Sequence, residues 1–205
     1  MFSLARPVFS MLLLSVLGAA SSMAAEPPPE VALCATCHGA AAPSPYASVP
    51  TIHGLPAAVL DNALYDFRAT IRPCRKVDCT GVADCPETDF CDIVARLSDE
   101  QIAGLAHWYA RQPYAPAGEP WDRALAARGS VLHAAHCESC HAGGGLSPVE
   151  EASILRGQRK AYLRLAMEDF HQERRVAVAE MHASIEGFTD ADVAALIEFY
   201  ASPLD

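Results

Sequence analysis

Apolar residues follow a helical period in two segments, one near the end of each half of the chain. The first begins after Ser98, which is placed to cap a helix with Gln101 as its reciprocal partner. The second begins after Thr189. In both, apolar residues fall at i, i+3, i+4 and i+7, namely Ile102, Leu105, Ala106 and Tyr109, and then Val193, Leu196, Ile197 and Tyr200. We therefore predict one amphipathic helix in each segment.

Further helices are expected over about 57–69, 121–135 and 158–172, and no segment alternates with the two-residue period of a strand. Aromatic residues make up only 7% of the chain and alanine is abundant, which favours helix over a β-sandwich. The pattern predicts an all-α protein.

The first 25 residues are typical of a secretory signal peptide. Arg6 is followed by an apolar run over 11–20 and then by small residues, with cleavage expected after Ala24 or Ala25. The run is too short to span a bilayer, and no other segment is apolar enough to do so. We therefore expect a soluble periplasmic protein, in a compartment where disulfides persist.

The chain contains an internal duplication. The motif Cys34-x-x-Cys37-His38 returns 103 residues later as Cys137-x-x-Cys140-His141. The same offset relates Ser44-Pro45 to Ser147-Pro148, Gly54 to Gly157 and Asp66-Phe67 to Asp169-Phe170. The two closing helices are only 91 residues apart, so the first copy holds 12 additional residues between Phe67 and Leu97. The helix that precedes the first motif is expected to be short or absent.

A linker separates the two copies. Residues 111–120 contain three prolines and a glycine, which places a boundary near residue 117. We predict two domains, over 26–116 and 117–205, with a cysteine-rich insertion over about 72–92 in the first.

The charge of the chain excludes one class of partner. Its 205 residues carry 15 basic and 25 acidic side chains, a net charge of −10, so nucleic acid is not an expected partner. The signal peptide holds one charged residue, Arg6, and its removal leaves −11. An acidic protein is expected to dock on a basic or neutral surface of another protein, with salt-sensitive rates.

The Cys-x-x-Cys-His motif has a specific chemical meaning. Two cysteines three residues apart can form thioethers to a haem, and the adjoining histidine supplies the proximal ligand of the iron. A thioredoxin-like pair would need a βαβ context, and a zinc site would need its ligands closer in sequence. We therefore predict two covalent haem c groups, attached at Cys34, Cys37, Cys137 and Cys140 with proximal ligands His38 and His141.

On these motifs and the repeated closing helices, the chain resembles the tandem dihaem c-type cytochromes. These include the cytochrome c4 kind and the cytochrome subunit of flavocytochrome c sulfide dehydrogenases. The resemblance covers the whole mature chain and implies two class I cytochrome c domains. It also implies an axial methionine seven residues before the apolar residue that precedes the last helix, which is Met181 in the second copy. Met167, expected to pack in the core, and His182 are the alternatives. Arg156, Gln158 and Tyr162 resemble positions that bind haem propionates.

The first copy departs from that pattern. Its equivalent position is Phe90, which cannot bind iron, and no methionine occurs in residues 26–166. The remaining candidates for the sixth ligand are the Cys91 thiolate, His53 and His107, or the site is open. Cys91 also belongs to a group of four cysteines that favours two disulfides with three possible pairings, formed among Cys74, Cys79, Cys85 and Cys91.

Two further expectations concern the surroundings of the motifs. Pro45 and Pro148 each follow the motif histidine by seven residues, which suits them to fix a carbonyl that accepts from the imidazole. An ordinary turn is the alternative. His133 and His136 precede the second motif on a helix and are expected to be solvated, as is the basic run over 158–164.

The sequence thus favours an electron-transfer protein that carries electrons between a periplasmic dehydrogenase and a downstream acceptor, with the direction of flow left open. The expected redox partners are a periplasmic dehydrogenase, with a flavoprotein subunit as one possibility, and a terminal oxidase or another cytochrome. The alternative is a haem enzyme or enzyme subunit that oxidises thiosulfate or sulfide at the first haem. A haem-based sensor or stabilising subunit is a third, weaker interpretation.

Overall fold

The computed structural model describes residues 26–203 apart from 42, 77–88, 148 and 150. The predicted signal peptide, Cys79, Cys85 and Pro148 lie outside these residues. The described part contains no strand, which confirms the all-α prediction. Its helices are α1 (Val31–His38), α2 (Ala57–Arg68), α3 (Phe90–Val94), α4 (Asp99–Ala110), α5 (Arg123–His136), α6 (Ala142–Gly145), α7 (Lys160–His171), α8 (Ala179–Ile185) and α9 (Asp190–Ala201).

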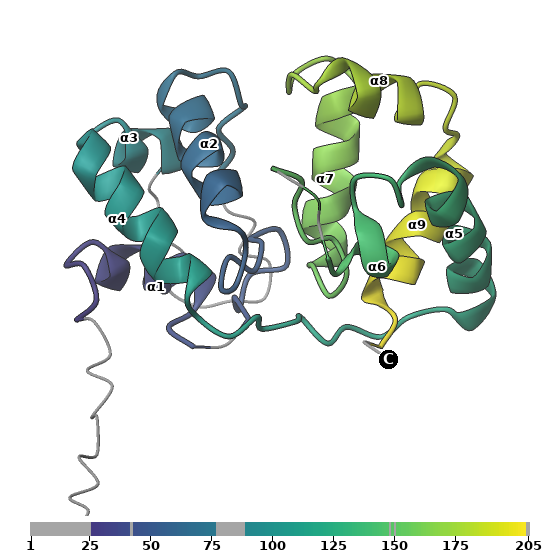
Figure 1. Ribbon diagram of the computed structural model, residues 1–205, viewed down its shortest axis with the longest axis horizontal. Helices are drawn as coiled ribbons and strands as arrows, with labels where there is room; N and C mark the ends of the chain where they lie inside the picture. Colours follow the sequence, from purple (N-terminus) through teal and green to yellow (C-terminus); the bar gives the residue numbers. More distant parts are fainter. Residues whose placement is uncertain (1–25, 42, 77–88, 148, 150, 204–205) are drawn as a thin grey trace, which may run out of the picture.

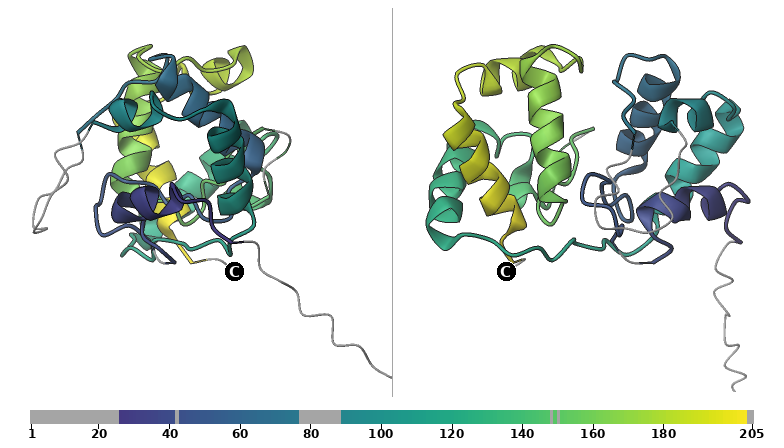
Figure 2. Two further views of the ribbon diagram at one scale, coloured as in Figure 1. Left: turned by 90° about the vertical axis from the view of Figure 1, so that its left-hand side faces the viewer. Right: turned by 180° about the vertical axis from the view of Figure 1, so that it is seen from behind.

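The helices form two groups, α1–α4 and α5–α9, which lie side by side in Figures 1 and 2. Each group has its own hydrophobic core, centred on the closing helices α4 and α9. An extended segment without helix runs from the end of α4 to the start of α5 (Figure 1), and the predicted boundary near residue 117 falls within it. The cores are not fully separate, because Ile154 of the second half is buried in the first core.

Both closing helices begin as the sequence predicts. Ser98 and Gln101 form a reciprocal capping box at α4, and Thr189 and Asp192 form one at α9. The apolar faces predicted for these two helices are buried, with each of their residues at most 7% exposed. Burial of such a face is the main stabilising contribution for helices of this length.

The remaining predicted helices are present with boundaries shifted by a few residues. Helices α2, α5 and α7 correspond to the ranges 57–69, 121–135 and 158–172. The first leading helix is short, as expected: α1 has 8 residues where α5 has 14. Prolines 27–29 stand directly before it, and a proline inside a helix removes a backbone donor and clashes with the preceding turn.

The close crossing of α5 and α9 sets the position of the second motif. Gly129 lies where these helices touch, and a Cβ atom there would be 2.1 Å from the carbonyl oxygen of Ala195. The absence of a side chain therefore allows the two backbones to approach directly. Because α5 ends one residue before Cys137, this contact anchors the motif to the closing helix.

The duplicated glycines Gly54 and Gly157 allow the linker to pass close to both halves. Both have positive φ, at 73° and 81°, and each amide donates to a tyrosine carbonyl of the closing helix, Tyr109 or Tyr200. A Cβ atom would lie 2.7 Å from the Tyr114 backbone at residue 54 and 2.6 Å from the Pro116 side chain at residue 157.

A reciprocal hydrogen-bond pair joins the two halves directly. The side chain of Gln158 accepts from the Thr51 amide at 3.1 Å and donates to the Thr51 carbonyl at 2.7 Å. Both residues are buried, so neither backbone group has water as an alternative partner. The Thr51 hydroxyl also donates to the carbonyl of Ala115 in the linker.

Candidate functional site

The two Cys-x-x-Cys-His motifs occupy different local structures. In the first half, Cys34, Cys37 and His38 all lie on α1, and His38 is its last residue. In the second half, α5 ends at His136 and the motif forms the turn that follows it. In both motifs the cysteines are unpaired thiols, whereas Cys74 and Cys91 form a disulfide. The motif thiols are therefore available for thioether bonds.

Each motif histidine is held by one ring nitrogen. The Nδ1 of His38 lies 2.9 Å from the Pro50 carbonyl oxygen, and that of His141 lies 2.8 Å from the Ser153 carbonyl oxygen. Nδ1 is thus the donor in both rings, which leaves Nε2 with its lone pair free to bind a metal. Burial lowers the pKa of His38 to about 4 and also lowers that of His141, so both imidazoles are neutral at neutral pH.

The expectation that a carbonyl near Pro45 or Pro148 holds the imidazole is wrong. The accepting carbonyl follows each motif histidine by twelve residues, not seven. In the first half, the buried Ser44 hydroxyl instead accepts from the Tyr46 amide, which forms the ordinary turn that was the alternative.

A tyrosine of the closing helix lies beside the first cysteine of each motif. Burial raises the pKa of Cys34 to about 11 and raises that of Cys137, which keeps both thiols protonated. The neighbouring Tyr109 and Tyr200 also have raised pKa values through burial. The surroundings of both attachment positions are thus apolar, which suits the hydrocarbon edge of a haem.

The residue in the first half at the expected ligand position is Phe90, and it lies near His38. Their ring centroids are 6.2 Å apart in an edge-on arrangement, and the Phe90 ring also packs edge-on against Phe67 at 4.7 Å. A hydrocarbon ring has no electron pair to give to iron. The first half thus has a hydrocarbon ring at the sequence position that Met181 occupies in the second half.

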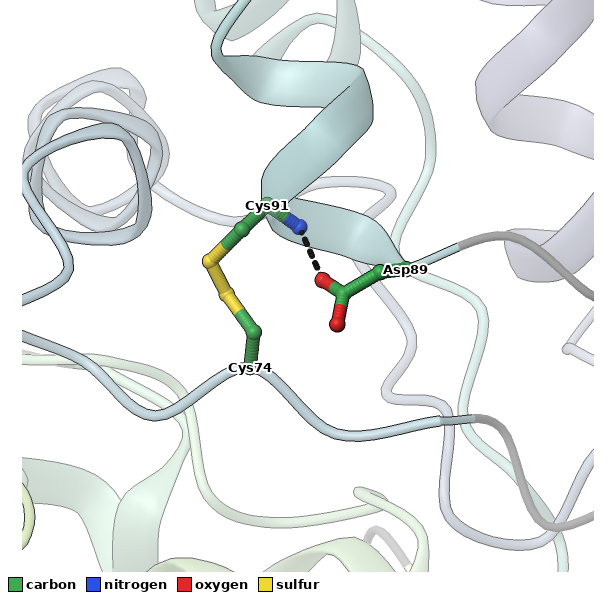
Figure 3. A group of neighbouring side chains, drawn as sticks. All are labelled: Cys74, Asp89 and Cys91. Carbon is green, nitrogen blue, oxygen red and sulfur yellow. Dashed lines mark hydrogen bonds between the residues drawn. A yellow bond between two sulfur atoms is a disulfide. The ribbon is translucent and has the colours of Figure 1, made fainter.

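The other candidates for a sixth ligand in the first half differ in their surroundings. Cys91 forms a disulfide with Cys74, so it is not a free thiolate (Figure 3). Asp89 caps α3 by accepting from the Cys91 amide at 2.8 Å. His53 packs edge-on against Tyr109 at 5.1 Å, beside the attachment motif. The remaining candidate, His107, is exposed on the last turn of α4.

In the second half, Met181 lies on α8 and is half-buried, and its role as an iron ligand stays a prediction. The neighbouring His182 is exposed. Met167 packs against the core formed by α5 and α9, in agreement with the packing role expected for it.

The expectation that His133 is solvated is wrong. Its side chain is 2% exposed, with Nδ1 lying 2.9 Å from the Tyr200 hydroxyl and Nε2 lying 2.6 Å from a carboxylate oxygen of Glu138. Glu138 also accepts from the amides of Gly143 and Gly144, and these donors lower its pKa. The network fastens the motif turn to α5 and α9. Sequence spacing gave no signal of it, because Glu138 belongs to a turn rather than to the helix of His133.

The positions that resemble propionate ligands have protein partners. Arg156 donates to the carbonyls of Ser202 and Pro203, Gln158 pairs with Thr51, and Tyr162 accepts from Arg72 at 2.9 Å.

Several buried polar atoms in the first half have no such partner. Among the described residues, both ring nitrogens of His53 lack a hydrogen-bond partner and the Tyr109 hydroxyl has only the Cys34 thiol beside it, although buried polar groups are usually satisfied. Together with the free thiols and the free Nε2 atoms, these atoms fit a bound group that carries its own polar substituents. A covalent haem is such a group.

Comparison with solved structures decides the fold. The chain superposes on reduced recombinant cytochrome c4 from Pseudomonas stutzeri with a TM-score of 0.69 and 24% identity, covering 84% of this chain and 94% of that one. It superposes on cytochrome c4 from Acidithiobacillus ferrooxidans with a TM-score of 0.67 and 20% identity, covering 83% and 98%. The chain has the fold of the dihaem c-type cytochromes. Two covalently bound haem c groups fit it, one at each motif.

Two further likenesses involve sulfur metabolism. The cytochrome fold seen here matches thiosulfate dehydrogenase (TsdBA) from Marichromatium purpuratum with a TM-score of 0.64 and 24% identity, covering 82% of this chain but 36% of that one. In sequence, the chain is 28% identical over 214 residues to the "thiosulfate dehydrogenase electron acceptor" of Thiomonas intermedia (strain K12), covering 96% of this chain and 92% of the relative. No protein-family profile matches the chain. None of the described helices combines the length and hydrophobicity needed to cross a membrane.

Proposed function

We propose that this protein is an exported electron carrier with two haem c groups, and that a thiosulfate dehydrogenase is its electron donor. The fold and the two motifs support the carrier role. The donor is supported by the name of the Thiomonas relative, which aligns over almost the whole of both chains.

The observation that carries the proposal is the repeated orientation of His38 and His141. In both halves a backbone carbonyl holds Nδ1 and leaves Nε2 for the iron, in an apolar site beside two free thiols. Bound haem c supplies reversible one-electron chemistry. The protein then needs only to hold each imidazole in a fixed tautomer, to exclude water and to attach the macrocycle.

The residue roles follow from these positions. Cys34, Cys37, Cys137 and Cys140 attach the two haems, and His38 and His141 are the proximal ligands. Met181 is the sixth ligand of the second haem, where a thioether raises the reduction potential. With Phe90 in the equivalent position, the first haem has no protein ligand on that side and a different potential.

The alternative of sulfur oxidation at the first haem is less well supported. It requires either an open iron face or a thiolate ligand at that haem. The thiolate candidate Cys91 is held in a disulfide. An open iron face is common to both proposals, and the relative that aligns over 96% of this chain is named as an electron acceptor, which favours the carrier.

Rapid-mixing spectroscopy tests the proposal. The oxidised holoprotein is mixed with a thiosulfate dehydrogenase and thiosulfate, and haem reduction is followed by absorbance. We expect reduction of both haems only when dehydrogenase and thiosulfate are present together, with rates that fall as salt is added. Reduction by thiosulfate alone, with turnover, would instead identify the protein as the oxidising enzyme. No reduction by the dehydrogenase would refute the proposed donor.

Export and cofactor content are tested together by mass spectrometry of the periplasmic fraction. We expect a chain that begins at residue 25 or 26 and carries the mass of two haems. A cytoplasmic, full-length product would contradict the proposed location.

A further inference from the structure

The carbonyl that holds His38 belongs to a peptide group at the boundary between the two halves. The oxygen of this group, from Pro50, lies 2.9 Å from Nδ1 of His38. Its N–H, from Thr51, donates to Oε1 of Gln158 in the second half at 3.1 Å. Because the Pro50 carbonyl and the Thr51 amide share one peptide bond, His38 and Gln158 are joined through a single planar group.

The orientation of the Gln158 amide is fixed by its two contacts with Thr51. A backbone N–H can only donate, so the atom that faces the Thr51 N–H must be the Gln158 oxygen. The NH2 group of Gln158 then donates to the Thr51 carbonyl at 2.7 Å. The Gln158 residue is 2% exposed and Thr51 is fully buried, so water does not compete for these bonds. Gln158 thus presents an acceptor to the peptide group that holds His38.

The backbone on both sides of Gln158 is tied to other elements. The amide of Gly157, the preceding residue, donates to the Tyr200 carbonyl of α9. Arg159, the following residue, is the N-cap of α7, and its side chain donates to the Ser44 carbonyl of the first half. These contacts hold Gln158 at the boundary and leave it little freedom to turn away.

The contact is not repeated in the second half. Gln158 corresponds to Leu55 in the repeat, and a leucine side chain cannot accept a hydrogen bond. The peptide group that holds His141 joins Ser153 to Ile154, and in the described part of the chain no side chain bonds to the Ile154 amide. A side-chain acceptor behind the proximal carbonyl is thus a feature of the first half alone among the described residues.

We infer that Gln158, from the second domain, is a positioning residue that lowers the reduction potential of the first haem. When a peptide N–H donates, the carbonyl of the same group becomes a stronger acceptor, and bonds in such a chain strengthen one another by roughly 10–30%. A stronger bond from Nδ1 of His38 to the Pro50 carbonyl makes the imidazole a more basic ligand. A more basic proximal ligand favours the ferric state of a haem.

The effect crosses the boundary between the domains, so the potential of the first haem depends on how the second domain packs against it. This inference rests on the two haem c groups of the proposed function and not on the proposed electron donor. A chain with fewer than two haems would contradict the proposed function. Two haems with unaltered potentials in the variant described next would contradict only this inference.

The test compares Gln158→Leu with the wild-type holoprotein. Leucine is the residue at the equivalent position of the first copy, and it accepts no hydrogen bond. Both proteins are titrated electrochemically, and each haem is followed by NMR through methyl resonances assigned to its own domain. In the variant, we expect the ratio of reduced to oxidised first haem at a fixed electrode potential to rise about two- to fivefold. The second haem should not change.

Two further variants separate polarisation of the peptide from a loosened boundary. Tyr114→Phe removes the hydrogen bond from the linker to the Arg156 carbonyl of the second half, and it should leave both potentials unchanged. Gln158→Glu keeps a carboxyl oxygen that accepts from the Thr51 amide. The first haem of Gln158→Glu should therefore be no easier to reduce than that of the wild type, even though the boundary is altered.

The outcomes separate cleanly. An unchanged first haem in folded Gln158→Leu protein would overturn the inference. An equal rise for the second haem, or for the first haem of Tyr114→Phe, would also overturn it, because a loosened boundary explains both. If Gln158→Leu does not fold with two haems, Gln158→Glu decides. A first haem that is easier to reduce than in the wild type then refutes the inference, and one that is equally or less easily reduced supports it.

Discussion

Replacing Gly129 by alanine tests the helix crossing on which the second haem site depends. The new Cβ atom would lie 2.1 Å from the Ala195 carbonyl oxygen and 2.7 Å from the Phe199 Cβ atom. Ordinary contacts begin near 3.4 Å, so α5 would have to move by about 1.3 Å in a closely packed interface. Overpacking of this kind costs about 3 kcal/mol, and the better helix propensity of alanine returns about 1 kcal/mol.

The net loss of about 2 kcal/mol corresponds to a fall in Tm of roughly 4–8 °C for a chain of this size. Thermal unfolding of the holoprotein would be followed by circular dichroism and by haem absorbance. Gly104→Ala is the matched control, because the nearest heavy atom to its new Cβ would be 4.0 Å away, and it should raise Tm by a few degrees. If Gly129→Ala unfolds at or above the wild-type temperature while Gly104→Ala behaves as expected, the proposed crossing is wrong.

Three other predictions address the haem sites and the insertion. Phe90→Met should supply a thioether ligand that the wild-type first half lacks. The reduced wild type should therefore bind one carbon monoxide per molecule, and the variant should bind none. If neither protein takes up carbon monoxide, the ligand assignment is wrong. Replacing both Cys74 and Cys91 by serine should lower the free energy of unfolding by about 3 kcal/mol, because their disulfide closes a 17-residue separation. The haem content should not change. Unchanged unfolding in denaturant would argue against this pairing. Glu138→Gln should lower Tm at neutral pH. The difference in Tm from wild type should shrink as the pH falls below the ordinary glutamate pKa of 4.5. The reason is that the lowered pKa of Glu138 stabilises the fold only while its carboxylate is charged. A difference that does not vary with pH would refute that role, and Ser139→Ala, exposed in the same turn, is the control.

The repeated architecture could be predicted from the sequence alone. Helix period, capping residues and the two cysteine motifs are local patterns, and local patterns specify local structure wherever a buried face supports them. For the same reason the sequence shows where the two copies differ, because Phe90 stands at the repeat position that Met181 occupies in the second copy. The short first helix also followed from local sequence, since prolines stand before it.

Contacts between groups far apart in the sequence could not be predicted, because they depend on how the helices and loops pack. The carbonyls that hold His38 and His141 lie twelve residues beyond the motif, at the end of loops whose paths have no periodic signal. His133 becomes a buried partner of Glu138 because α5 and α9 cross closely enough to exclude water around it. The hydrogen bond from Arg72 to the Tyr162 hydroxyl likewise depends on how the two halves pack, because the two residues are 90 positions apart in the sequence.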